Sequence, residues 1–358
     1  MITKNNRCLL TVATYSYLPK AVVLIESFII NNPGCDVLLL VPDVSHDKIK
    51  SVEWPIPPFV KMIGIDDIEN PLLQKMKQYF DAFELCCAAK SFLLEHGLFK
   101  EGYEKAILLD PDIVCYASFD QVWSVLDHAD VALTPHTCSP MPDDGLLPDD
   151  CEFVNSGFIN GGFCAVKRTE NSKKCLNWII EKVFNYGFFI PQINLYADQT
   201  WMSCLPWFFP NNTLILRNSG MNVAYWNLHE RELTAEKGAI FSNDERLVFF
   251  HFSGYDEKNP GQITKHSLRK FSENNNIILQ NLVDDYRKKL ENIIQNMPQL
   301  IPDMPCNNLP IHTRIVIYEI VRGEKIKFIA NMQQKSNFGR HDSIFRKVRE
   351  MLRKRNKG

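Results

Sequence analysis

The segment Asp110-Pro111-Asp112 combines residue types and a spacing that can do chemistry. It follows residues 106–109, an apolar run typical of a buried strand. Pro111 fixes its own φ and favours an extended Asp110, so the two carboxylates project to one side. Carboxylates in this arrangement repel each other unless a hard divalent cation lies between them. A cation with open coordination positions can hold a diphosphate and neutralise it as it departs. The structural alternative is a helix-capping turn after the strand.

The elements expected around this pair alternate between strands and helices, which predicts an α/β fold with sites where strands end. Apolar runs predict strands at residues 8–13, 36–41, 59–65, 105–109, 131–134, 158–166 and 247–252. Helical spacing of apolar residues predicts helices at residues 18–30, 79–96, 172–186, 198–207 and 276–295. Residues 135–151 are rich in Pro and Asp and predict a long surface loop of the kind that serves as a lid.

Composition restricts the class of protein. The chain of 358 residues is 45% hydrophobic and 23% charged, as globular proteins are, which excludes disorder, collagen and coiled coil. A formal charge of −2 argues against a nucleic-acid partner. The 11 cysteines form no Cys-x-x-Cys pair and suit reduced thiols in a cytoplasmic protein. We expect no membrane-spanning helix, because no apolar run approaches the length that one needs.

The charge is unevenly distributed along the chain. Residues 340–358 hold eight basic and two acidic residues, a formal charge of +6, which leaves 32 basic and 40 acidic residues and −8 on the rest. The basic residues of this tail surround an apolar helical stripe, and such a helix can lie on an anionic membrane surface, here the inner face of the cell membrane. A solvated terminal helix and nucleic-acid binding are the alternatives. We expect one α/β domain at residues 1–260 and a helical extension at residues 261–358.

Five short motifs occur in one order along the first domain. They are residues 9–13 with Tyr17-Leu18-Pro19, residues 107–112, Asn160-Gly161-Gly162, Asp198-Gln199 and His251-Phe252-Ser253-Gly254. Their order resembles nucleotide-sugar-dependent glycosyltransferases of the GT-A fold, family 8 and the related bacterial polysaccharide and lipopolysaccharide enzymes. The resemblance covers about residues 8–260. It implies a Rossmann-like mixed sheet flanked by helices.

The resemblance also implies a metal and donor site. Asp110, Asp112 and His251 would bind Mn²⁺ or Mg²⁺, and imidazole suits Mn²⁺ better. The implied contacts to the UDP-sugar donor are a nucleobase pocket at Thr14 and Tyr17, a nucleotide or phosphate contact at Lys90, ribose at Asp110, and the sugar at Asn160, Gly161 and Gly162. Asp198 would accept a hydrogen bond from a sugar hydroxyl, and Gln199 would lie on the reacting face of the anomeric carbon.

Two features depart from the family pattern. The segment after Gly254 has one extra residue and lacks the family's Trp, so Lys258 and Lys265 are both candidates for the diphosphate-binding lysine. Lys90 stands where the family often has arginine. A lysine would bind phosphate as a point charge, without the forked guanidinium of arginine. Residues 222–227 resemble the bacterial members more than the eukaryotic ones.

Each of these residues has a structural alternative. His251 ends an apolar strand and can be a satisfied core residue, and Asp198 can be a helix N-cap. Gly161-Gly162 can be a β-bulge, and Lys90 a solvated position on a helix.

The expected function is transfer of a hexose from a UDP-sugar to a hydroxyl of a glycan or lipid-linked glycan acceptor, of capsule, O-antigen or lipopolysaccharide type. Family 8 members retain anomeric configuration, so the resemblance implies retention. The alternatives are a non-catalytic member that binds a sugar nucleotide or glycan, and a nucleotidyltransferase. The latter normally needs a glycine-rich loop after the first strand, and residues 15–19 contain no glycine.

Overall fold

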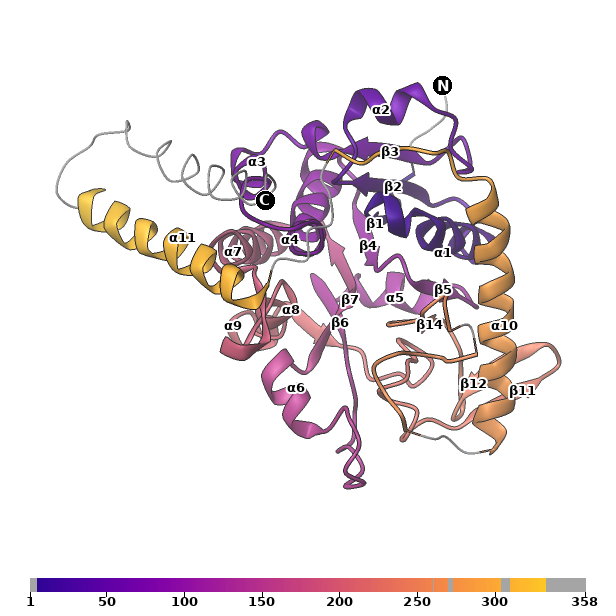
Figure 1. Ribbon diagram of the computed structural model, residues 1–358. Coiled ribbons are helices and arrows are strands. Elements are labelled where there is room, and N and C mark those ends of the chain that lie inside the picture. Colours follow the sequence, from indigo (N-terminus) through magenta and orange to yellow (C-terminus); the bar gives the residue numbers. More distant parts are fainter. Residues whose placement is uncertain (1–4, 260, 270–272, 304–309, 333–358) are drawn as a thin grey trace.

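A seven-stranded mixed sheet forms the centre of the protein in the computed structural model, which describes residues 5–259, 261–269, 273–303 and 310–332 (Figure 1). The strand order is β10-β6-β7-β4-β1-β2-β3. These strands are β1 (Arg7–Val12), β2 (Asp36–Val41), β3 (Lys61–Gly64), β4 (Lys105–Leu109), β6 (Val131–Pro135), β7 (Ile159–Lys167) and β10 (Thr213–Ile215). Strands β1 to β4 are parallel, and β7 is antiparallel to both β4 and β6. The carboxyl ends of β1 and β4 therefore meet at one edge of the sheet.

Helices cover both faces of the sheet. They are α1 (Leu18–Asn31), α2 (His46–Ser51), α3 (Pro71–Met76), α4 (Ala82–Glu95), α5 (Asp120–Val125), α6 (Asp150–Ser156), α7 (Glu170–Tyr186), α8 (Gln199–Met202), α9 (Leu205–Phe208), α10 (Glu273–Gln295) and α11 (Ile311–Met332). Leu10 and Leu108 face the layer of α4 and α7, whereas Leu9 and Ile107 face α1 and α5. Strands buried on both faces read as continuous apolar runs, which is why β2 and β4 have the bounds predicted for them.

Short strands add three small sheets. The first pairs β5 (Ile113–Cys115) with β14 (Phe249–His251), and it lies next to the end of β4. The others join β8 (Phe189–Ile190) to β9 (Leu195–Tyr196), and β11 (Leu233–Glu236) to β12 (Ala239–Ser242) and β13 (Glu245–Arg246). The helix predicted at residues 198–207 is two short helices, because Pro206 starts a new helix at its first turn.

The segment after residue 260 packs on the sheet domain. Leu282, Tyr286 and Leu290 of α10 share a core cluster with Val22 and Val23 of α1, and Figure 1 shows α10 running beside α1. The chain then returns to the first loop, where the Tyr15 hydroxyl donates to the carbonyl of Pro298 and accepts from the Leu300 amide at 3.2 Å. The helix predicted at residues 276–295 is confirmed as α10.

The C-terminal helix α11 packs beside α4 and α7. Ile317 and Tyr318 belong to the same core cluster as Phe188, and Arg314 forms ion pairs with Asp81 and Glu84 at the start of α4. The basic tail at residues 340–358 lies outside the described residues. The division at residue 260 stays a prediction.

Within the described part of the chain, no helix is both long and apolar enough to span a bilayer. No disulfide joins the ten cysteines there, and five of them are buried.

Candidate active site

Two neighbouring turns bring the acidic pair and His251 together. After β4, the amide of Asp110 donates to the carbonyl of Gly162 at 2.9 Å, and the Ile113 amide donates to the carbonyl of Asp110 at 3.2 Å. Strand β5 begins directly after Asp112 and pairs with β14, with Ile113 opposite His251. A strand follows the pair, so the helix-capping alternative is wrong. Pairing of β5 with β14 is what joins a histidine to carboxylates far away in the sequence.

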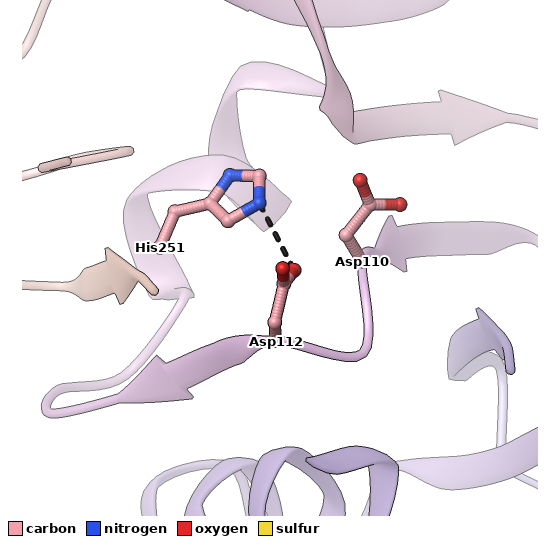
Figure 2. A group of neighbouring side chains, drawn as sticks. All are labelled: Asp110, Asp112 and His251. Atoms are coloured by element: carbon pink, nitrogen blue, oxygen red, sulfur yellow. Dashed lines mark ion pairs between the residues drawn. The ribbon is translucent and has the colours of Figure 1, made fainter. Parts of the chain in front are cut away.

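The three side chains form a compact set of metal-ligand types. The Nε2 of His251 lies 3.0 Å from Oδ1 of Asp112, and one ligand atom from each of Asp110, Asp112 and His251 lies within 4.8 Å of the others. Figure 2 shows the imidazole pointing at Asp112, with Asp110 on the other side of the turn. Two carboxylates and one imidazole are donors that a divalent cation accepts, so the residues present fit a metal centre. His251 is buried, but its outer nitrogen faces a carboxylate rather than the core.

Asp112 is held in its charged form. Burial is the largest single influence and would raise its pKa, but His251 together with smaller contributions outweighs burial, and the pKa lies below its ordinary value. An ionised carboxylate at this position is ready to bind a cation.

Lys90 links the acidic pair to the segment before α8. Its Nζ lies 2.6 Å from Oδ1 of Asp110 and 3.7 Å from Oδ2 of Asp198, and it donates to the carbonyl of Gly161 at 3.1 Å. Burial would lower the pKa of Lys90, but the two carboxylates raise it well above its usual value. The alternative of a solvated position is therefore wrong. Contact between Lys90 and a nucleotide stays a prediction.

Asp198 and Gln199 are fixed beside this lysine. Asp198 occupies the N-cap position of α8, as the structural alternative has it, but its side chain makes no capping hydrogen bond there and instead lies near Lys90. Burial raises the pKa of Asp198 to about 6 against the opposing effect of Lys90. Gln199 accepts a hydrogen bond from the Gly161 amide at 3.2 Å and donates to the carbonyl of Ser156 at 3.0 Å. Their side chains thus have defined positions next to the carboxylates.

The segment Asn160-Gly161-Gly162 lies in β7 behind the metal ligands. The register with β6 changes here, from Leu133 opposite Cys164 to Pro135 opposite Ile159, so the strand is irregular, as the alternative of a β-bulge has it. A Cβ on Gly162 would lie 2.5 Å from Cε1 of His251, whereas one on Gly161 would meet nothing closer than 3.5 Å. Gly162 therefore makes room for the imidazole. The predicted contact of these residues with a donor sugar remains a prediction.

The other predicted donor contacts lie in two loops. Thr14 is buried, with its hydroxyl 3.0 Å from that of Ser16, and Tyr17 is 42% exposed with the Lys20 ammonium 4.5 Å from its ring centre. Partial burial and the charge of Asp112 raise the pKa of Tyr17 to about 12, so the negative charge of the acidic pair acts on this hydroxyl.

In the loop after β14, Gly254 has a φ of 74° and a Cβ there would lie 2.2 Å from His266, so only glycine fits. Lys258 and Lys265 are both exposed, and the choice between them stays open.

Residues that the sequence did not single out complete the site. Asn222 accepts a hydrogen bond from Nδ1 of His251 at 3.3 Å, and the Trp226 ring lies edge-on to the imidazole at 5.2 Å. His136 is buried and stacked on Phe153, and burial lowers its pKa to about 4. Lys20 is buried near Asp112 and lowers the pKa of that carboxyl further. The one signal for Asn222 and Trp226 was the resemblance of residues 222–227 to bacterial enzymes.

The sheet and the acidic turn define a class of protein: α/β proteins with a candidate metal site where a parallel strand ends. Comparison with known sequences makes the class specific, since the family described as Glycosyl transferase family 8 matches residues 8–212. The match spans more than half of the chain, so the chain belongs to that family and is a glycosyltransferase. The predicted α/β, GT-A fold class is confirmed.

Individual relatives are distant. YfnF of Bacillus subtilis (strain 168), an uncharacterized protein, is 24% identical over 252 residues, which are 68% of this chain and 79% of YfnF. Mouse xyloside xylosyltransferase 1 is 13% identical, with 69% of this chain and 97% of that chain covered and a TM-score of 0.43. The galactosyltransferase LgtC, solved with donor and acceptor sugar analogs, is 11% identical, with coverages of 82% and 97% and a TM-score of 0.47.

Proposed function

We propose that this glycosyltransferase moves a hexose from a UDP-sugar to a hydroxyl group of a glycan acceptor, in a reaction that needs a divalent cation. The observation that supports the proposal best is the convergence of Asp110, Asp112 and His251 within 4.8 Å. When bound there, Mn²⁺ or Mg²⁺ would act as a Lewis acid that stabilises UDP as it leaves. One imidazole among the ligands favours Mn²⁺.

The neighbouring side chains have roles that fit this reaction. Lys90 forms ion pairs with both Asp110 and Asp198 and so holds the two carboxylates close together. Asp198, with a pKa of about 6, is charged at neutral pH and accepts a hydrogen bond from a hydroxyl of the donor sugar. Gln199 is held by Gly161 and Ser156 and lies on the reacting face of the anomeric carbon.

The proposed outcome is retention of the anomeric configuration. Gln199 is an amide and a poor nucleophile, so we assign it no covalent intermediate. The acceptor oxygen forms its bond to the anomeric carbon on the face from which UDP departs, while the bond between that carbon and the UDP oxygen breaks. The proton of the acceptor hydroxyl passes to the departing diphosphate.

The remaining contacts extend the same proposal. Thr14 and Tyr17 would contact the nucleobase. The backbone of Asn160, Gly161 and Gly162 would contact the sugar. The loop of Gly254, with Lys258 or Lys265, would bind the diphosphate. The acceptor is a glycan or lipid-linked glycan of capsule, O-antigen or lipopolysaccharide type.

A cytoplasmic protein could reach such an acceptor at the inner face of the membrane through its basic tail. Co-sedimentation with anionic liposomes, with and without residues 340–358, tests this. Equal binding by both proteins removes the membrane role.

The experiment for the reaction measures UDP release from UDP-glucose, UDP-galactose and their N-acetyl forms. Wild type should release UDP with Mn²⁺, lose this activity with EDTA and regain it when Mn²⁺ is restored. Asp112→Ala should lower the rate at least about 100-fold, whereas Asp47→Ala, at an exposed position on α2, should not change it. Full activity of Asp112→Ala, or of the chelated wild type, would contradict the metal assignment.

A further inference from the structure

We propose that Asn222 is a positioning residue of the metal centre, which keeps the proton of His251 on Nδ1 and so leaves Nε2 directed toward Asp112 and the cation. This inference rests on the proposed function, because it requires that a cation bind at Asp110, Asp112 and His251. It follows from a chain of hydrogen bonds that starts at a backbone amide and ends at the imidazole.

The direction of each hydrogen bond in this chain is fixed. A backbone N–H can only donate, and the Gly162 amide donates to Oδ1 of Asn160 at 3.1 Å. Because that oxygen accepts, the Asn222 atom 3.1 Å from it is the amide nitrogen Nδ2, which also lies 3.1 Å from the hydroxyl oxygen of Thr134. The remaining amide atom of Asn222, Oδ1, then faces Nδ1 of His251 at 3.3 Å. An amide oxygen only accepts, so Nδ1 carries the proton.

The backbone of Asn222 is held in the conformation that aims this side chain. Its φ is 53°, in the left-handed region that asparagine tolerates better than most residues. The carbonyl of Asn222 accepts from Asn227 Nδ2 at 2.9 Å, and the carbonyl of Met221 accepts from the buried Arg231 at 2.6 Å. On the other side, the His251 amide donates to the carbonyl of Val223 at 2.8 Å. Contacts on both sides therefore keep Asn222 next to His251.

Asp112 is the other neighbour that bears on the protonation of the imidazole, because its Oδ1 accepts from Nε2–H at 3.0 Å when no cation is bound. The Trp226 ring lies edge-on to the imidazole at 5.2 Å, and the imidazole fills the space beside Gly162. When a cation takes the place of the Nε2 proton, the acceptor at Nδ1 holds the remaining proton there, so Nε2 is the nitrogen that binds the cation. In metal centres a partner of this kind sets the orientation and basicity of the ligand, and its loss weakens metal binding about 10–100-fold.

The test measures Mn²⁺ affinity by electron paramagnetic resonance of the free ion, without substrate. Asn222→Gly removes the hydrogen-bond acceptor of His251, and glycine adopts the positive φ of this position without strain. We expect the Kd of this variant for Mn²⁺ to rise about 10–100-fold. Asn222→Asp keeps an acceptor at the same place and should stay within about threefold of wild type. Thr134→Val removes a different partner of the Asn222 side chain but leaves its contact with His251, so it is the matched control and should also stay within about threefold of wild type.

A purely structural role for Asn222 predicts different results. The inference would be overturned if Asn222→Gly bound Mn²⁺ as tightly as wild type. It would also be overturned if Asn222→Asp and Thr134→Val weakened Mn²⁺ binding as much as Asn222→Gly does. Combined with His251→Ala, Asn222→Gly should add less than about a threefold loss, because its effect passes through the imidazole. Additive losses would also overturn it.

Two further results keep the inference separate from the proposed function. Failure of wild type to bind Mn²⁺, or wild-type affinity in His251→Ala, refutes the metal centre itself. If Asn222→Gly does not fold, long-range ¹H–¹⁵N spectra of the wild type decide the matter. They should show Nδ1 of His251 protonated, and an unprotonated Nδ1 rejects the proposal.

Discussion

Replacing Gly162 with alanine tests whether the position of the His251 ring controls metal binding. The new Cβ would lie 2.5 Å from Cε1 of His251, 3.0 Å from its Nδ1 and 2.8 Å from Oδ1 of Asn160. Carbon atoms pack best at about 3.5 Å, so the ring must move by about 1 Å. The backbone of Gly162 cannot yield instead, because its carbonyl accepts from the Asp110 amide at 2.9 Å and its amide donates to Asn160 at 3.1 Å.

The magnitude follows from the tolerance of a metal site. Ligand distances are fixed to within about 0.2 Å, so a ring displaced by about 1 Å no longer reaches a cation held by the two carboxylates. We expect Gly162→Ala to weaken Mn²⁺ binding about 10–100-fold, or about 1.4–2.7 kcal/mol. Turnover of the UDP-sugar should fall about 100-fold, which is the usual cost of a 1 Å misplacement in an active site.

The neighbouring glycine provides the control for the assay. Gly161→Ala places its Cβ no closer than 3.5 Å to any atom, so its Mn²⁺ affinity should stay within about threefold of wild type. Both variants are titrated with Mn²⁺ by electron paramagnetic resonance, and their melting temperatures are recorded to exclude unfolding. A folded Gly162→Ala protein that binds Mn²⁺ as wild type does would refute the reasoning.

Two further predictions concern stability. Lys90→Met leaves the buried Asp198 and the half-buried Asp110 without their cation, and it should lower the free energy of unfolding in urea by about 3 kcal/mol; an unchanged urea midpoint would show that the ion pairs contribute little. Burial raises the pKa of Asp43 to about 6, against the hydrogen bond from the Tyr15 amide. The neutral carboxyl is favoured in the folded state, so this contribution to stability is complete below the unfolded pKa near 4 and is lost as pH rises through about 6. Asp43→Asn should therefore lose less stability than wild type between about pH 4 and about pH 7, and equal losses would contradict the assignment.

The sequence predicted the central sheet because its inner strands carry their signal locally. Residues 36–41 and 105–109 are buried on both faces, so each is a continuous apolar run with recognisable ends. Helices α2, α3 and α5 have six residues each, too few to establish a helical period, and none of them was predicted. Strands such as β5 and β13 are formed by pairing with distant segments, which no local pattern reveals.

The candidate site divides in the same way. The sequence alone identified Asp110 and Asp112, because Pro111 and the end of an apolar strand constrain them within a few residues. The tertiary structure decided which groups face them: Lys90 between two carboxylates, the imidazole of His251 on Asp112, and Gly162 as the space for that ring. It also identified Asn222, whose partners His251, Asn160 and Thr134 lie between 29 and 88 residues away. Hydrogen bonds depend on the distance between atoms in space, and a spacing along the chain carries that information only when both groups lie on one local element.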